Sequence, residues 1–140
     1  MANERPYSTL IERLKAVGLR PTRQRLALAR LLREGGNRHL SAEQLHEEAL
    51  AAKVRVSLAT VYNALHQFTA AGLLREIVVE PGRSYFDTNV EDHHHFYYED
   101  SGRLEDIPGE AVRLASLPKP PKGTRLARVD VIIRVAGERE

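Results

Sequence analysis

The stretch Ser57–Gly72, SLATVYNALHQFTAAG, decides how the first half of the chain folds. Its larger apolar side chains recur at intervals of three or four residues, which places them on one face of an α-helix. They are Leu58, Val61, Leu65 and Phe68. Ser57 is a favoured residue at a helix N-cap, and Gly72 is favoured just after a last turn. The pattern therefore predicts an amphipathic helix over about residues 57–71.

The opposite face of this helix is typical of a DNA-recognition helix. Such a helix buries one side and presents small or hydrogen-bonding side chains to the major groove. Ala59 and Thr60 are small enough to approach base edges or a thymine methyl group, and Tyr62 can reach a phosphate or a base. Asn63 could read adenine or be an ordinary surface amide. We therefore predict DNA contacts at this helix by Ser57, Ala59, Thr60, Tyr62 and Asn63.

Basic residues elsewhere in the first half suit the phosphate backbone. Residues 1–40 hold nine basic and three acidic residues, a net charge of +6 in a chain whose total is +2. Arg20, Arg23 and Arg25 flank the start of an earlier helix, and Arg83 lies on a hairpin. Phosphate contacts supply affinity, whereas base contacts supply sequence choice. The alternative is that these four arginines are solvated surface charge.

The other patterns of the first half complete a winged helix-turn-helix. Apolar spacing predicts three further helices, at 7–17, from Pro21 to the glycine pair at 35–36, and at 41–52. Ser41 and Gln44 form a capping-box pattern at the start of the last of these. After Gly72 the apolar period changes to two, which predicts short strands at 73–80 and 83–88. We expect a DNA-binding domain over residues 1–88.

The second half has a different pattern. Strand-like runs occupy 93–98 and 103–107, and residues 108–116 can form a short helix. The run PKPPKG at 118–123 is a stiff linker. The run RVDVIIRVA at 128–136 is the clearest strand of the chain. We expect a small α/β domain over residues 89–140, and hence an α+β chain. No apolar run approaches the roughly 20 residues of a membrane span and no signal segment is evident, which predicts a cytoplasmic protein.

Three adjacent histidines, His93–His95, lie in an acidic stretch of a chain that has no cysteine. Any metal must therefore be held by nitrogen and oxygen. Alternate side chains of a strand share a face, so His93 and His95 point one way. A four-residue loop at 99–102 would place His95 opposite Asp106, close enough to share an ion. Such sets suit Zn, Mn, Fe(II) or Co(II). The alternative is an exposed polar strand, or one core histidine with two bystanders.

Taken together, RPTRQRLALARLL, HLSAEQLHEEA, SLATVYNALHQFTAAGLL, GRSYFD and the histidine block resemble the ferric uptake regulator family over nearly the whole chain. The resemblance implies a homodimeric winged-helix repressor or activator that binds an inverted-repeat operator in double-stranded DNA. It also implies a C-terminal domain for dimerisation and metal sensing. The sensing site that it implies links the two domains through His39, Asp87, His93, His95 and Asp106 and takes Fe, Mn or Zn.

Departures from the common family pattern indicate which branch of the family this sequence resembles. Tyr98 and Ser101 stand where many members have a zinc-binding cysteine pair, so no structural cysteine–zinc site is expected. The cysteine-free form with HHHFYYED and VDVIIRV is similar to the iron response regulator branch. That likeness implies an iron-responsive regulator that binds haem through His93, His94 and His95, and a haem-delivery enzyme would then be a further partner.

Two other functions remain open at this point. Within the family, a peroxide sensor would use the same three-histidine, two-aspartate ligand types. Outside it, two histidines and a carboxylate with open positions could serve a small non-haem metalloenzyme. No nucleophile or general-base pattern accompanies the cluster, so we do not expect an enzyme.

Overall fold

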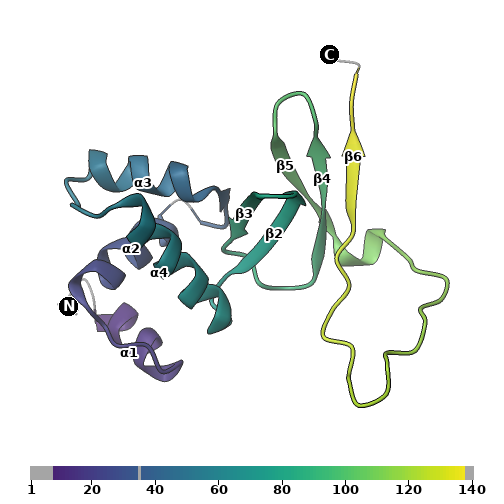
Figure 1. The fold of residues 1–140 in the computed structure, drawn as a ribbon, viewed down its shortest axis with the longest axis horizontal. Coiled ribbons are helices and arrows are strands. Elements are labelled where there is room, and N and C mark those ends of the chain that lie inside the picture. Colours follow the sequence, from purple (N-terminus) through teal and green to yellow (C-terminus); the bar gives the residue numbers. More distant parts are fainter. Residues whose placement is uncertain (1–7, 35, 138–140) are drawn as a thin grey trace, which may run out of the picture. The chain divides into compact units, whose positions relative to one another are not determined.

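The computed structural model describes residues 8–34 and 36–137. The chain divides into two compact units, Met1–Val90 and Glu91–Glu140, and each is described by itself. Helices dominate the first unit and strands the second (Figure 1). Within the described residues, none of the helices combines the length and the apolar character that crossing a membrane requires.

The first unit places helices ahead of a small sheet. Its elements are α1 (Ser8–Ala16), α2 (Arg23–Arg33), β1 (His39–Leu40), α3 (Ala42–Ala51), α4 (Leu58–Ala70), β2 (Arg75–Glu80) and β3 (Arg83–Asp87). The strands form one sheet in the order β1-β3-β2. Strand β1 was not predicted, because two residues are too few to show a period of two. It pairs with β3 in the register His39–Asp87 and Leu40–Phe86.

Side-chain caps fix where the helices begin. The Ser41 hydroxyl accepts a hydrogen bond from the Gln44 amide, and the Gln44 side chain accepts one from the Ser41 amide, which confirms the predicted capping box. The Ser57 hydroxyl caps α4 by accepting from the Thr60 amide at 3.0 Å. Helix α2 begins later than expected, because the cap is Thr22 rather than a residue before Pro21.

The predicted apolar stripe of α4 lies in the core of this unit. Val61 and Leu65 are fully buried, and Phe68 is nearly so. They pack in one cluster with Leu28 of α2, Leu45 of α3 and other residues of the same unit. Non-directional burial of these side chains holds the helices together, and it leaves the other face of α4 for solvent. There Ala59, Tyr62 and Asn63 are exposed and Thr60 is half-buried.

The second unit is a three-stranded sheet. Its strands are β4 (His93–Tyr98), β5 (Arg103–Pro108) and β6 (Ile132–Val135), in the order β5-β4-β6. Strands β4 and β5 are antiparallel, with Tyr98 opposite Arg103 and His95 opposite Asp106, which confirms the register predicted from the loop length. Strand β6 runs parallel to β4.

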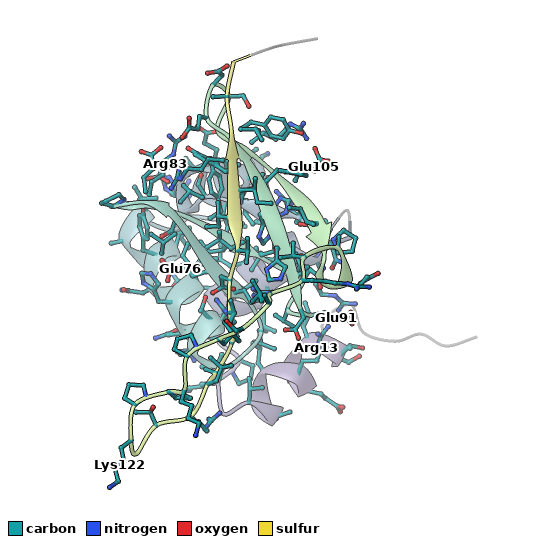
Figure 2. All side chains as sticks on the ribbon, turned by 90° about the vertical axis from the view of Figure 1, so that its right-hand side faces the viewer. Arg13, Glu76, Arg83, Glu91, Glu105 and Lys122 are labelled. Carbon is teal, nitrogen blue, oxygen red and sulfur yellow. The ribbon has the colours of Figure 1, made fainter. Side chains whose placement is uncertain are left out.

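Two expectations for the second unit were wrong in part. The run at 108–116 forms only a 3₁₀ turn, Gly109–Ala111, with no side-chain cap, and Val112 already has an extended backbone. The strand expected over 128–136 is limited to β6, because the paired register with β4 covers only Ile132–Val135. The intervening segment from 112 to 131 is largely exposed, and Figure 2 shows Lys122 at its tip.

Candidate metal half-sites and DNA-binding surface

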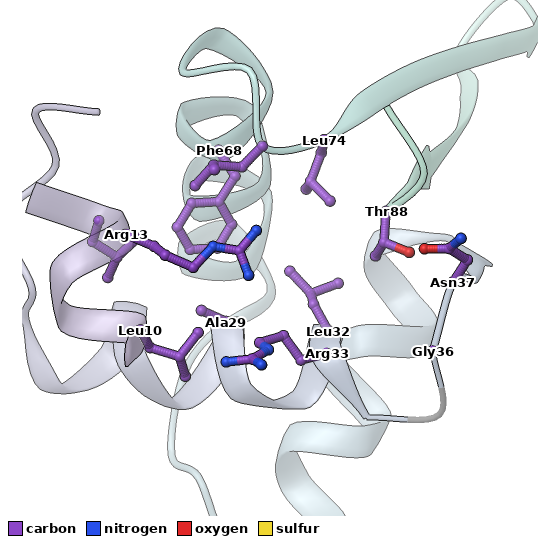
Figure 3. Close-up of a pocket in the computed structure, with 12 residues that line it drawn as sticks. Leu10, Arg13, Ala29, Leu32, Arg33, Gly36, Asn37, Phe68, Leu74 and Thr88 are labelled. Carbon is purple, nitrogen blue, oxygen red and sulfur yellow. The ribbon is translucent and has the colours of Figure 1, made fainter. Parts of the chain in front are cut away.

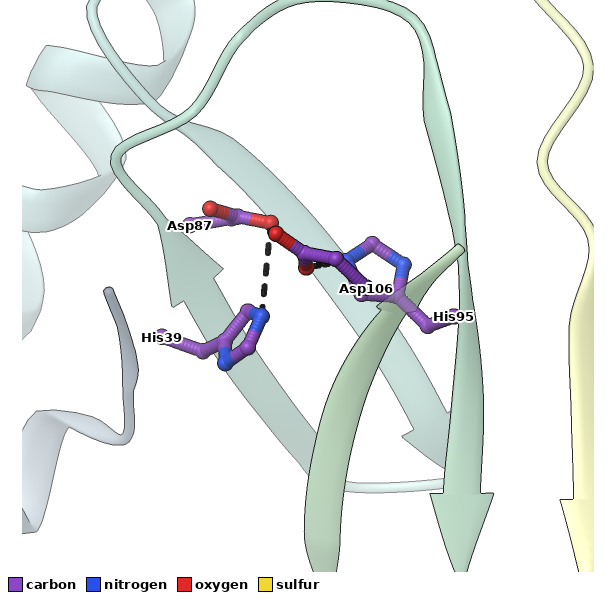
Figure 4. A group of neighbouring side chains, drawn as sticks. All are labelled: His39, Asp87, His95 and Asp106. Carbon is purple, nitrogen blue, oxygen red and sulfur yellow. Dashed lines mark ion pairs between the residues drawn. The ribbon is translucent and has the colours of Figure 1, made fainter. Parts of the chain in front are cut away.

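The first unit brings together two of the predicted metal ligands. His39 on β1 and Asp87 at the end of β3 are cross-strand partners, so both side chains leave the same face of the sheet. The His39 Nε2 atom lies 3.9 Å from Asp87 Oδ2 (Figure 4). Asp87 is almost fully buried. A buried carboxylate beside an imidazole is a favourable place for a cation, because an uncompensated buried charge is costly.

Hydrogen bonds on both sides hold this pair in place. The Asn89 amide donates to Asp87 Oδ1 at 2.9 Å, which leaves Oδ2 as the oxygen directed at His39. The Thr88 amide donates to the Arg38 carbonyl at 3.0 Å, and the Arg38 amide donates to the Thr88 hydroxyl at 2.9 Å. The Arg38 guanidinium also bonds the Glu48 carboxylate on α3. These contacts extend the β1–β3 pairing and anchor it to the helices.

The second unit brings together the other three predicted metal ligands. His93 and His95 occupy one face of β4, and Asp106 faces them from β5. The His93 and His95 Nε2 atoms lie 3.6 Å and 3.5 Å from the same Asp106 oxygen, Oδ1. Figure 4 draws His95 with Asp106. Both imidazoles are buried, and the carboxylate is partly open to solvent.

The backbone determines which nitrogen His93 can offer a metal. His93 Nδ1 lies 2.5 Å from the Glu91 carbonyl oxygen, which can only accept a hydrogen bond. Nδ1 must therefore carry the proton, and in the neutral ring Nε2 keeps the lone pair. This carbonyl–imidazole contact is the usual outer-sphere device that orients a metal-binding histidine. The lone pair consequently lies on the side of Asp106.

The spacing of these atoms fits shared coordination better than hydrogen bonding. At 3.5–3.9 Å the three pairs are longer than a hydrogen bond between nitrogen and oxygen. Two ligands held about 2.1 Å from one tetrahedral ion are about 3.4 Å apart. Each half-site therefore needs only a small closure to hold an ion. Its imidazole and carboxylate donors suit Fe, Mn or Zn.

The predicted haem set does not gather on one surface. His93 and His95 share a face, but His94 points to the other side of β4. There His94 Nδ1 accepts a hydrogen bond from the Val131 amide at 3.1 Å, beside β6. A single haem face cannot meet all three imidazoles in this arrangement.

The predicted DNA contacts lie on exposed parts of the first unit. On α4, Ala59 and Asn63 are exposed, and so is the N-cap residue Ser57. The exposed arginines are Arg20 before α2, Arg23 on α2 and Arg83 at the β2–β3 turn, which Figure 2 labels. Arg25 is half-buried. Its guanidinium donates to the Gln67 side-chain oxygen on α4 at 2.8 Å and to the Arg20 carbonyl at 2.9 Å. Arg25 therefore braces the two helices against each other.

Tyr62 has a partner that sequence reasoning missed. Its hydroxyl donates to Glu43 Oε2 on α3 at 3.0 Å. This hydrogen bond, with burial and the nearby negative charge, raises the pKa of the Tyr62 phenol. The two residues are nineteen positions apart and belong to different helices, so no local pattern could have indicated the pair. The contact fixes the ring on the exposed side of α4.

The sequence model of the ferric uptake regulator family matches residues 16–130. The chain belongs to the ferric uptake regulator family. Members of this family are metal-responsive transcription regulators, which leaves the metalloenzyme alternative without support.

Individual relatives agree with this assignment. The ferric uptake regulation protein of Legionella pneumophila is 37% identical over 102 residues, which cover 72% of this chain and 75% of that protein. The ferric uptake regulator of Pseudomonas aeruginosa, solved with manganese, is 27% identical with a TM-score of 0.69 and covers 91% of this chain and 97% of its own. The ferric uptake regulator of Vibrio cholerae is 23% identical with a TM-score of 0.71, and the match covers 91% of this chain and 99% of that one. The predicted α+β fold is confirmed by these likenesses.

Proposed function

We propose that this chain is an iron-responsive transcription regulator that binds operator DNA as a homodimer. A divalent ion held by His39, Asp87, His93, His95 and Asp106 would control that binding. The observation that carries the proposal is the presence of a half-site with the same donor chemistry in each unit. Both contain imidazole Nε2 atoms directed at a carboxylate.

Each half-site by itself leaves coordination positions of an ion open. His39 and Asp87 offer two donors, and His93, His95 and Asp106 offer three. Divalent transition metals take four to six ligands, so the protein would fill most positions of one ion only if both sets met at it, and water would complete a single set. The ion would then bind best to the arrangement in which the two units meet at it. Five nitrogen and oxygen ligands also favour Fe(II) or Mn(II) over the four-coordinate geometry usual for structural zinc.

Metal binding would change DNA affinity by selecting one arrangement of the units. The effect of the ion can be no larger than its preference for that arrangement. By linkage, operator DNA would raise or lower metal affinity by the same factor. The exposed face of α4 supplies the base contacts, and Arg20, Arg23 and Arg83 supply phosphate contacts.

A second copy of the chain is the expected protein partner. Strand β6 pairs with β4 on one side, and in the described chain its other side has no strand partner. Ile133 on this edge strand is exposed. An open edge with an apolar side chain is a ready surface for pairing between chains. A dimer would present two copies of α4 to an inverted repeat.

The metal site is tested by titrating Fe(II) or Mn(II) into the anaerobic protein. Calorimetry should show tight binding that His39→Ala and His95→Ala each weaken by at least about tenfold, since each removes a ligand. His66→Ala is the matched control, because His66 is an exposed imidazole on α4 with no place in either half-site. If His39→Ala binds metal like the parent while His95→Ala does not, the ion belongs to the second unit alone.

DNA binding is tested through its dependence on salt. Affinity for the operator should fall steeply as salt rises, and Arg23→Gln should reduce the slope of the log–log plot by about 1. A salt-independent affinity would remove the phosphate role of the arginines.

Two finer alternatives concern the signal. Peroxide sensing is favoured by the donor types of the two half-sites, which are three imidazoles and two carboxylates in total. A one-oxygen mass increase on His39, His93 or His95 after Fe(II) and peroxide would support it. Haem sensing has less support, because His94 faces away from His93 and His95 and is hydrogen-bonded to Val131. A haem absorption spectrum that changes with His94→Ala would revive it, and with it a role for a haem-delivery enzyme.

A further inference from the structure

A pocket of about 260 Å³ opens in the first unit (Figure 3). Side chains from α1, α2, the end of α4 and the connection between α4 and β2 line it. Its apolar wall consists of Leu10, Leu14, Ala29, Leu32, Phe68, Leu73 and Leu74. An engineered cavity of about 150 Å³ with a comparable lining binds benzene. This pocket therefore has room for an apolar group larger than a single aromatic ring.

Two guanidinium groups accompany the apolar wall. Arg13 on α1 and Arg33 at the end of α2 both line the pocket, and Figure 3 shows their guanidinium groups directed into the space between the helices. Within residues 8–34 and 36–137, neither side chain forms an ion pair or a hydrogen bond. Two cations directed at one space repel each other, and an anion between them would remove that cost.

We propose that this pocket binds a small amphipathic carboxylate. Its apolar body, a short acyl chain or a fused ring pair, would lie against Ala29 and Leu73, the partly exposed members of the apolar wall. Its carboxylate would accept hydrogen bonds from Arg13 and Arg33, whose planar guanidinium groups match a carboxylate in a bidentate manner. A neutral or cationic ligand of the same shape would leave both arginines uncompensated.

The pocket also touches the elements on which gene control would depend. Phe68 belongs to α4, which carries the DNA-reading face, and Thr88 of the lining adjoins the metal ligand Asp87. A bound carboxylate could therefore change DNA or metal affinity if it prefers one arrangement of these elements. Occupation of the pocket does not depend on that coupling or on the metal site.

The direct test is calorimetric titration of the full chain with octanoate, alongside octanol and octylammonium as neutral and cationic analogues. We expect saturable octanoate binding, with both analogues weaker by at least about tenfold, since a hydrogen bond to a charged group contributes on that scale. The double substitution Arg13→Gln/Arg33→Gln should weaken octanoate by about tenfold or more and leave octanol unchanged. Arg55→Gln removes one exposed charge of the same unit outside the pocket and should change nothing.

A second variant tests the apolar wall separately from Arg13 and Arg33. Ala29→Leu adds volume inside the pocket, so it should weaken octanoate and octanol alike. In the parent protein, methyl NMR shifts on octanoate binding should centre on Ala29 and Leu73. Equal affinity for the three ligands, unchanged octanoate binding by the double glutamine variant, or no saturable binding at millimolar octanoate would each overturn the proposal. None of these results bears on metal or operator binding.

Discussion

The two units of this chain differ in what holds them together. In the first, most of the buried side chains form one apolar cluster that four helices and a sheet share. In the second, the buried apolar residues are Tyr97, Leu104 and Ile107, and two of the buried side chains beside them are His93 and His95. A segment of about 50 residues seldom buries enough apolar surface to be stable alone. Hydrophobic burial therefore dominates the first unit, and we expect the second to rely more on its histidine site and on a partner.

The largest expected effect tests the core of the first unit. Leu65→Ala removes a fully buried side chain from the cluster and should lower the free energy of unfolding by about 2–5 kcal/mol, through lost transfer energy and a cavity. Leu50→Ala, at a side chain that is 54% exposed, is the matched control and should cost less than about 0.5 kcal/mol. Thermal unfolding followed by circular dichroism measures both. Equal effects would mean that this core does not dominate the first unit.

The next effect tests the reliance of the second unit on metal. An ion that binds only the folded state stabilises it by about 2.7 kcal/mol at a hundredfold excess over its Kd. Mn(II) should therefore raise the unfolding temperature of the parent, and a Kd about tenfold weaker in His95→Ala should reduce the stabilisation by about half at the same Mn(II) concentration. Hydrogen exchange of the β4 and β5 amides should report the same change. An equal rise in the parent and in His95→Ala would break the proposed contrast between the units.

A smaller effect concerns local hydrogen bonds in each unit. Ser41→Ala deletes the hydroxyl that caps α3, which is one half of the capping box. This loss should lower the free energy of unfolding by about 1 kcal/mol. Ser101→Ala removes a weaker contact, in which the Ser101 hydroxyl accepts from the Arg103 amide at 3.3 Å in an exposed turn. Chemical denaturation should show the first loss and almost none from the second. If the two costs are alike, local caps do not distinguish the units.

The smallest effect is a loss of folding stability at alkaline pH, to which one tyrosine in each unit contributes. Hydrogen bonds to Glu43 and to Glu105 raise the pKa of Tyr62 and of Tyr98, respectively. Because each folded pKa lies above the unfolded value near 10, the associated stability is fully present below about pH 10 and is lost as pH rises through the folded pKa. In a pH titration followed by tyrosinate absorbance, one late-titrating phenol should disappear in Tyr62→Phe and another in Tyr98→Phe. Glu43→Gln should shift only the first phenol, towards 10.

Several elements followed from the sequence because their causes are local. The caps at Ser41 and Ser57 act within three residues, and the apolar period of α4 already specified its buried face. The four-residue loop at 99–102 determined the register that pairs His95 with Asp106. The expected helix at 108–116 failed for a related reason: composition allowed it, but no cap or buried face stabilised it beyond one 3₁₀ turn.

By itself, the sequence determined the type and approximate extent of most elements, the exposed face of α4 and the donor atoms available to a metal. The tertiary structure alone decided that β1 brings His39 opposite Asp87, that Glu43 holds Tyr62, and that Arg13 and Arg33 line one pocket. Periods and caps act over a few residues along the chain. These contacts instead arise when the apolar core packs together segments that lie far apart in sequence.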